Sequence, residues 1–202
     1  MNHLMLLYGS AILSIDTPDG LLIRFFQNAS DELRHSAFAQ TGQKFARDSE
    51  HGAPQHIERF QRLWEWRIST ISQFSLAQDA DRELAAFGWW MQTDVFPPLW
   101  SLQQPDRVLN LVDRIDMSPF VVARLAAIGE LEPRLTLRCL DRLVKSDTRS
   151  WSSSEWDTSV RTILTVALQQ EDEEIRDQAK ALVSSLALRG HTSYLALLSE
   201  AQ

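Results

Sequence analysis

The sequence predicts an all-α fold of about ten or eleven helices, in which antiparallel helical hairpins stack as a short solenoid. Strand signals are nearly absent, and the 202-residue chain contains only seven glycines and seven prolines. The last third of the chain also repeats itself at a spacing of 39 residues. In this repeat, the apolar positions Val121, Leu125, Leu140, Leu143 and Val144 recur as Val160, Leu164, Ala179, Leu182 and Val183. Each copy matches two short amphipathic helices joined by a turn, which is the unit of a stacked helical repeat.

Turn and cap signals divide the first fifty residues into three predicted helices. A first helix from about His3 to Ser14 ends at the turn signal Asp16-Thr17-Pro18-Asp19-Gly20. A second helix covers about Leu21 to Gln27, and Ser30 is the predicted N-cap of a third helix that ends near Arg47. The residues that the third helix is expected to bury are Leu33, Ala37, Phe38 and Phe45.

The strongest helical periodicity follows Pro54 and extends to about Ser75. Its predicted core residues are Ile57, Phe60, Leu63, Trp64, Ile68, Ile71 and Phe74. Asp79 or Asp81 is expected to cap the next helix. That helix carries Trp89 and Trp90, which cannot share one face, so we expect neighbours on several sides. Pro97-Pro98 interrupts the pattern, and a further helix is expected from about Pro105 to Ile115.

The second half of the chain shows cap signals at both ends of the repeated pairs. Ser118-Pro119 and Gly129 bracket one helix, and Pro133 begins the next, which ends near Lys145. Ser152 and Glu155 form a capping box for a helix that ends near Gln169. The acidic run Asp172-Glu173-Glu174 complements the start of a helix that stops at Gly190, and a short helix covers 192–201. The clearest repeat pairs are 118–145 and 155–189, and residues 1–202 are expected to form one domain.

Charge and cysteine content limit the classes of partner and compartment. Twenty basic residues stand against 27 acidic ones, for a net charge of -7 and a pI near 5.2. Because a general nucleic-acid binder needs a basic surface, nucleic acid is not the expected partner. The single cysteine, Cys139, lies between leucines and is expected to be a core residue. The apolar start, Met1 to Ile15, lacks a signal-peptide pattern and is too short to span a bilayer, so we expect a cytoplasmic protein with no membrane partner.

The sequence contains no recognised catalytic or cofactor-binding motif, and we expect neither a cofactor nor a metal. His51 and His56 have no further ligand pair beside them, and His35 is expected on the surface. The chain is therefore interpreted as a non-enzymatic binding module. An enzyme with a site inside a helical bundle stays an alternative, although no convergent titratable groups support it.

Arg134, Arg138 and Arg142 are the first candidate binding residues, because their spacing places them along one face of a helix. One interpretation is a solvated helix face. The other is recognition of an acidic partner or of a phosphate backbone, since one row of helices usually lines the binding surface of a solenoid.

Trp66 and Arg62 are the second candidate pair. Trp66 lies among polar helix neighbours that include Arg59, away from the core positions of the same helix. A large aromatic residue beside arginine is typical of an interface hot spot, either with a protein partner or within a homo-oligomer. Packing against a neighbouring helix is the alternative.

Several motifs carry a resemblance to a known group of proteins. These are Phe25-Phe26, Ala29 to Arg34, Leu63-Trp64-Glu65-Trp66-Arg67, Glu83 to Trp90, and Trp100. Together they resemble the C-terminal helical region of large bacterial anti-phage defence proteins that carry NTPase or sirtuin-like effector domains. The stretch Ile175 to Leu182 is similar to the second helix of a HEAT repeat. The resemblance implies a HEAT-like region that senses a trigger or assembles a complex, either as a separately encoded subunit or as a C-terminal fragment.

Three hypotheses about function follow. The first is a protein-interaction or scaffold module of a bacterial antiviral defence assembly. The second is a HEAT-like nucleic-acid-binding protein, such as the alkylpurine DNA glycosylases of that architecture, which the acidic pI disfavours. The third is an enzyme whose site lies inside a helical bundle.

Overall fold

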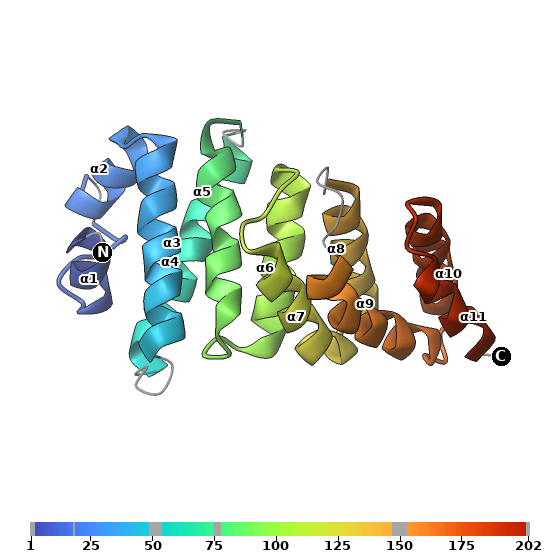
Figure 1. Cartoon of the computed structure of the whole chain (residues 1–202). Coiled ribbons are helices and arrows are strands. Elements are labelled where there is room, and N and C mark those ends of the chain that lie inside the picture. Colours follow the sequence, from blue (N-terminus) through green and yellow to red (C-terminus); the bar gives the residue numbers. More distant parts are fainter. Residues whose placement is uncertain (1–2, 18, 49–53, 75–77, 147–152, 201–202) are drawn as a thin grey trace.

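The computed structural model describes residues 3–17, 19–48, 54–74, 78–146 and 153–200. Across these residues the chain forms eleven α-helices and four short 3-10 helices, with no strand. The predicted all-α class and the number of helices are therefore confirmed. The helices succeed one another across the molecule, from the N-terminal end at one side to the C-terminal end at the other (Figure 1).

The helix bounds agree closely with the predicted segments in most of the chain. The α-helices are α1 (His3–Gly9), α2 (Leu21–Asn28), α3 (Asp31–Asp48), α4 (Pro54–Gln73), α5 (Asp81–Ala85), α6 (Pro98–Leu111), α7 (Ser118–Ile128), α8 (Pro133–Ser146), α9 (Ser153–Leu168), α10 (Glu173–Leu188) and α11 (Ala196–Glu200). The 3-10 helices are η1 (Gln78–Ala80), η2 (Ala86–Gln92), η3 (Gly129–Leu131) and η4 (Thr192–Leu195).

Three of the predicted helix-end signals act as expected. The Ser30 hydroxyl accepts a hydrogen bond from the Leu33 amide at the start of α3, at 3.3 Å. At the start of α10, the Asp172 carboxylate accepts from the Glu174 amide at 2.9 Å. Gly190 follows α10 with a φ of 98°, a conformation that costs glycine little.

Other predicted ends were wrong. α1 ends at Gly9 rather than at Ser14. α6 begins at Pro98 rather than at Pro105, because a proline is tolerated in the first turn of a helix. Pro105 lies within α6. Met117, in a left-handed conformation, occupies the N-cap position of α7 that was expected for Ser118. The predicted capping box of Ser152 and Glu155 lies outside the described residues.

The start of α5 is capped from a distant part of the chain. Neither Asp79 nor Asp81 provides the cap. Instead, the Asp31 carboxylate at the start of α3 accepts from the backbone amides of Arg82 and Glu83, at 3.0 and 2.8 Å. One acidic side chain therefore holds the starts of two helices together.

The chain tightens into the 3-10 helix η2 where a continuous α-helix was expected. η2 packs against α3, α6 and α7, which explains why both of its tryptophans find neighbours. Trp90 is buried and Trp89 is half-buried. A Cβ atom on Gly88 would lie 1.7 Å from the Asp116 carbonyl oxygen, so only glycine allows η2 to approach the connection between α6 and α7 this closely.

The core is aromatic in the N-terminal half and largely aliphatic in the C-terminal half. Aromatic contacts in the described part of the N-terminal half form one connected network, whose members are Tyr8, Phe25, Phe26, Phe38, Phe45, Phe60, Trp64, Trp66, Phe87, Trp90, Phe96 and Trp100. Most predicted core residues are buried, but Leu33 and Phe74 are exposed and were wrongly placed inside. Leu33 lies in the first turn of α3, and Phe74 follows the last residue of α4. At these helix ends the neighbouring elements leave both side chains exposed.

A buried ion triad links α3, α4 and α5. Glu83 is fully buried and accepts hydrogen bonds from two buried arginines. Arg34 Nε lies 2.5 Å from Glu83 Oε2, while Arg67 Nε and Nη2 lie 2.6 and 3.0 Å from Oε1 and Oε2. Arg34 also donates to the carbonyl groups of Ala29 and Asp79. Two cations therefore share one carboxylate in the interior.

The two repeat pairs lie side by side. α7 packs against α9, and α8 packs against both α9 and α10. All ten apolar positions of the 39-residue repeat are buried, so corresponding residues of the two copies occupy core positions. None of the helices in the described part of the chain combines the length and apolar character needed to cross a membrane.

Candidate functional site

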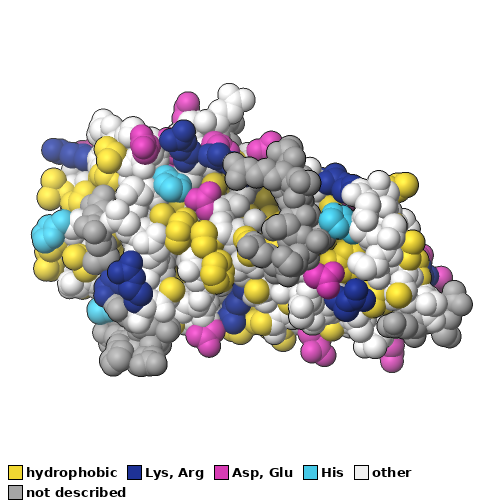
Figure 2. Space-filling view, in the orientation of Figure 1, with side chains coloured by type: hydrophobic (Ala, Val, Ile, Leu, Met, Phe, Trp, Pro, Cys, Tyr) yellow, Lys and Arg dark blue, Asp and Glu magenta, His cyan; other side chains and the backbone are white. Residues whose placement is uncertain are grey.

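Arg134, Arg138 and Arg142 lie along one face of α8, as their spacing predicts. Arg134 and Arg138 are exposed, and Arg142 is half-buried. Figure 2 shows one face of the molecule, on which basic side chains are interspersed with acidic ones. Each arginine of this row likewise lies beside an acidic side chain.

Arg134 pairs with the start of α10. Its Nη2 lies 2.6 Å from Asp172 Oδ2, and its Nη1 lies 2.5 Å from Glu174 Oε2. The hydrogen bond from Arg134 holds the pKa of the Asp172 carboxyl below its usual value. The carboxylate that caps α10 is thus also bonded to the neighbouring hairpin.

The other two arginines pair with Asp106 on α6. Arg138 binds this carboxylate with two hydrogen bonds, of 2.7 Å from Nε and 3.0 Å from Nη2. Arg142 Nη1 donates to the Asp106 carbonyl at 3.4 Å and lies 3.6 Å from its Oδ1 atom. The row therefore joins α8 to α6 on one side and to α10 on the other, and an external partner would compete with these acceptors.

A groove of about 540 Å³ runs between α8 and α10 beside these pairs. Its walls combine apolar side chains with both signs of charge, from Arg134, Leu137, Arg138, Asp141, Lys145, Glu174, Gln178, Ala181, Leu182 and Ser185. Lys145 is itself paired with Asp141, at 2.6 Å.

Trp66 and Arg62 line a shallow surface depression of about 590 Å³, here called the Trp66–Trp100 depression. Its remaining lining residues are Ile15, Glu58, Gln61, Glu65 and Trp100. Arg62 is exposed and pairs with Asp16, with Nη2 3.0 Å from Oδ1. Trp66 is half-buried, so it contributes both to packing and to the surface.

The polar face expected around Trp66 is partly covered. Arg59 donates to the carbonyl groups of Tyr8 and Leu13, at 2.9 and 2.7 Å, and its guanidinium lies 4.6 Å from the centre of the Tyr8 ring. α1 and the segment after it therefore cover this side of α4. The part of the face that carries Arg62 and Trp66 borders the depression.

Glu65 and Trp100 complete this site and were missed as site residues at the sequence level. Glu65 Oε1 accepts from Trp100 Nε1 at 2.9 Å, and its other oxygen pairs with Arg107. Trp100 lies on α6, 34 positions beyond Trp66 on α4, so the helical periodicity used to place Trp66 could not bring it into the same site.

His35 is half-buried, not the surface residue that was expected. Its Nε2 lies 2.7 Å from Asp116 Oδ2, which also accepts from Trp89 Nε1 at 3.3 Å. This cluster joins α3 and η2 to the connection between α6 and α7. It lies at the close approach of Gly88 and Asp116 and strengthens that contact.

The cysteine and the remaining histidines that could react or bind a metal do not form a site in the described residues. Cys139 is buried, and its burial raises the pKa of the thiol to about 12, so it is not a nucleophile near neutral pH. His56 is exposed, and His51 lies outside the described residues. Across the described ranges, no group of three or more His, Cys, Asp or Glu side chains is arranged to hold a metal ion.

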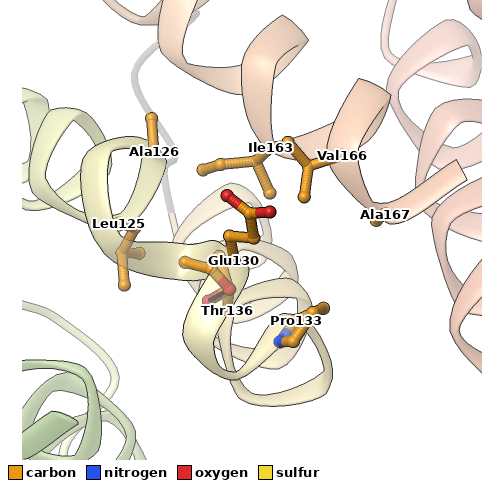
Figure 3. Close-up of a pocket in the computed structure, with 9 residues that line it drawn as sticks. Leu125, Ala126, Glu130, Pro133, Thr136, Ile163, Val166 and Ala167 are labelled. Atoms are coloured by element: carbon orange, nitrogen blue, oxygen red, sulfur yellow. Dashed lines mark hydrogen bonds between the residues drawn. The ribbon is translucent and has the colours of Figure 1, made fainter. Parts of the chain in front are cut away.

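A small crevice lies where α7, η3, α8 and α9 meet. Figure 3 shows Glu130 reaching over it between Thr136 and Ile163. Its volume is about 10 Å³, roughly the space that one water molecule requires. A crevice of this size cannot admit an organic substrate.

Comparisons with known proteins provide no relative for this chain. No protein-family model, no curated protein and no solved structure matches it.

Proposed function

We propose that this chain is a non-enzymatic, HEAT-like helical-repeat module that binds proteins within a bacterial anti-phage defence assembly. It would act in the cytoplasm as a sensor or assembly subunit. The observation that carries the proposal is the packing of α7 on α9 and of α8 on both α9 and α10, with equivalent repeat positions buried. Stacked hairpins of this kind present extended surfaces suited to protein partners.

The grooves support a protein partner over a small molecule. The groove between α8 and α10 and the Trp66–Trp100 depression are open and are lined by both apolar and charged side chains, whereas the crevice in Figure 3 has only the volume of about one water molecule. An open surface with half-buried aromatic and arginine side chains is typical of an interface.

The test is purification of the tagged chain from its native host, followed by reconstitution with each recombinant candidate partner. We expect one partner to form a stoichiometric complex in size-exclusion chromatography with light scattering. A chain that forms neither such a complex nor a homo-oligomer would contradict the proposal.

Nucleic-acid binding is the competing outcome, and we expect it to be weak. The three arginines on α8 already pair with carboxylates, and three phosphate contacts would give a log–log salt slope of only about -3. Fluorescence anisotropy with labelled duplex and single-stranded DNA tests this at about 150 mM salt. Submicromolar affinity that is lost after Arg134→Glu, Arg138→Glu and Arg142→Glu would favour the nucleic-acid hypothesis instead.

A further inference from the structure

The Trp66–Trp100 depression brings two indole rings and two carboxylates to one surface. Trp66 comes from α4 and Trp100 from α6, while Glu58 and Glu65 lie on α4 beside them. Both tryptophans are only partly buried, so each leaves part of its ring available at the surface.

Contacts with neighbouring aromatic rings restrain both indoles. The Trp66 ring packs edge-on against Phe26, with centroids 5.6 Å apart. Trp100 stacks on Phe96 at 5.0 Å and contacts Phe87 at 5.7 Å. Its Nε1 group is also fixed by the hydrogen bond to Glu65. Little side-chain freedom remains to be lost when a partner binds.

The charged side chains that line the depression are Glu58, Arg62 and Glu65, so its lining has one acidic charge in excess. Arg62 pairs with Asp16, and Glu65 pairs with Arg107, so these two pairs compensate within the chain. Glu58 is exposed on the rim and has no ion-pair partner within the described ranges. The whole chain carries a net charge of -7, which attracts a cationic partner.

We infer that this depression binds an arginine side chain presented by a protein partner, with its guanidinium against the indoles and its charge beside Glu58. Indole faces attract cations, and the planar guanidinium stacks on aromatic rings and pairs with carboxylates. The inference rests on the proposed function and specifies the chemistry of the partner. An anionic side chain would meet the uncompensated Glu58 carboxylate and is disfavoured.

The direct test follows the tryptophan indole N–H signals by NMR while N-acetyl-Gly-Arg-Gly amide is added. Trp→Phe substitutions assign the signals. We expect saturable shifts at Trp66 and Trp100, with smaller changes at the buried Trp64 and Trp90. The matched citrulline peptide, which has no charge, should produce much smaller shifts. Equal shifts with citrulline, larger shifts with a glutamate peptide, or no saturable shift with arginine would each overturn the inference.

Two variants separate this site from general attraction to an acidic protein. Glu58→Gln should weaken arginine binding about two- to five-fold, the range for an exposed charge pair. The control is Glu132, an exposed glutamate between η3 and α8 that does not line the depression, and Glu132→Gln should leave arginine binding unchanged. With an intact native partner, Trp66→Ala should weaken binding about 30-fold. A partner that binds the Trp66→Ala variant unchanged refutes this site but leaves the proposed function intact. Failure to form any protein complex while the peptide still binds refutes the proposed function alone.

Discussion

Removing the Glu83 carboxylate should be among the most damaging single changes in this protein. Glu83 is fully buried, and its two oxygens accept three hydrogen bonds from Arg34 and Arg67. After Glu83→Ala, Arg34 still donates to two backbone carbonyls. The described hydrogen bonds of Arg67, by contrast, both go to Glu83, so its buried charge would lose its acceptor.

The expected loss follows from leaving these cations without a counterion. Removing one partner of a buried ion pair typically costs about 3–5 kcal/mol of unfolding free energy. For a chain of this length each kcal/mol lowers the melting temperature by about 2–4 °C, so we expect a decrease of roughly 6–20 °C. Exposed Glu132 is the matched control, and Glu132→Ala should change stability by less than about 0.5 kcal/mol.

Urea unfolding followed by far-UV circular dichroism measures these differences. In the Glu83→Ala background, Arg67→Met should restore part of the lost stability, because it removes the unpaired charge and keeps an apolar chain beside Phe26. Guanidinium contact with that ring, at 5.5 Å from its centre, would be lost and limits the recovery. If Glu83→Ala costs less than about 1 kcal/mol, as an exposed pair would, or if Arg67→Met deepens the loss, the reasoning is wrong.

Three further predictions concern the interface candidate, the thiol and acid stability. Phe60→Ala should cost about 3–5 kcal/mol because Phe60 is buried, and half-exposed Trp66→Ala should cost clearly less in the same urea titration. Equal losses would make Trp66 a core residue. Burial and its pKa of about 12 should keep Cys139 unreactive towards iodoacetamide until the chain unfolds; mass spectrometry that detects rapid alkylation of the folded chain would contradict this. Because Arg134 depresses the pKa of Asp172 in the folded chain, their contribution is present above the usual carboxyl pKa and is lost as pH falls through the lowered value. Asp172→Asn should therefore flatten the acid side of the stability curve, and an unchanged curve would argue against the pair.

The sequence predicts this fold well where local signals determine it. The sequence alone shows the period of apolar residues, the N-cap at Ser30, the acidic helix start at Asp172 to Glu174 and the stop at Gly190, because these signals act within one helix and its flanking residues. The cap of α5 could not be predicted in this way, because Asp31 reaches it from 51 positions earlier in the chain. Similarly, η2 has a 3-10 geometry that no local propensity indicates, in the segment where Gly88 packs closely on Asp116.

The candidate sites show the same limit. Helical spacing correctly placed Arg134, Arg138 and Arg142 on one face, yet it could not show that Asp106 and Asp172 accept their hydrogen bonds from other helices. For Trp66, the polar neighbours along α4 suggested an open surface. The chain segment that covers Arg59 and the indole of Trp100 both come from elsewhere in the sequence, so only the three-dimensional arrangement defines the depression.

The division between an aromatic half and an aliphatic half affects how unfolding can be observed. Across the described residues, the network of ring contacts runs from Tyr8 to Trp100, whereas the buried aromatic side chains of the C-terminal half are Trp156 and Tyr194, so near-ultraviolet circular dichroism should report mainly on the N-terminal half. α10 packs against α8, α9 and η4, far from those rings, and an end helix can open before the rest of a chain. Amide hydrogen exchange would detect such opening while most of the near-ultraviolet signal remained. A single sharp optical transition would then measure the stability of the N-terminal, aromatic half. The stability of the C-terminal half would have to be measured separately, by hydrogen exchange.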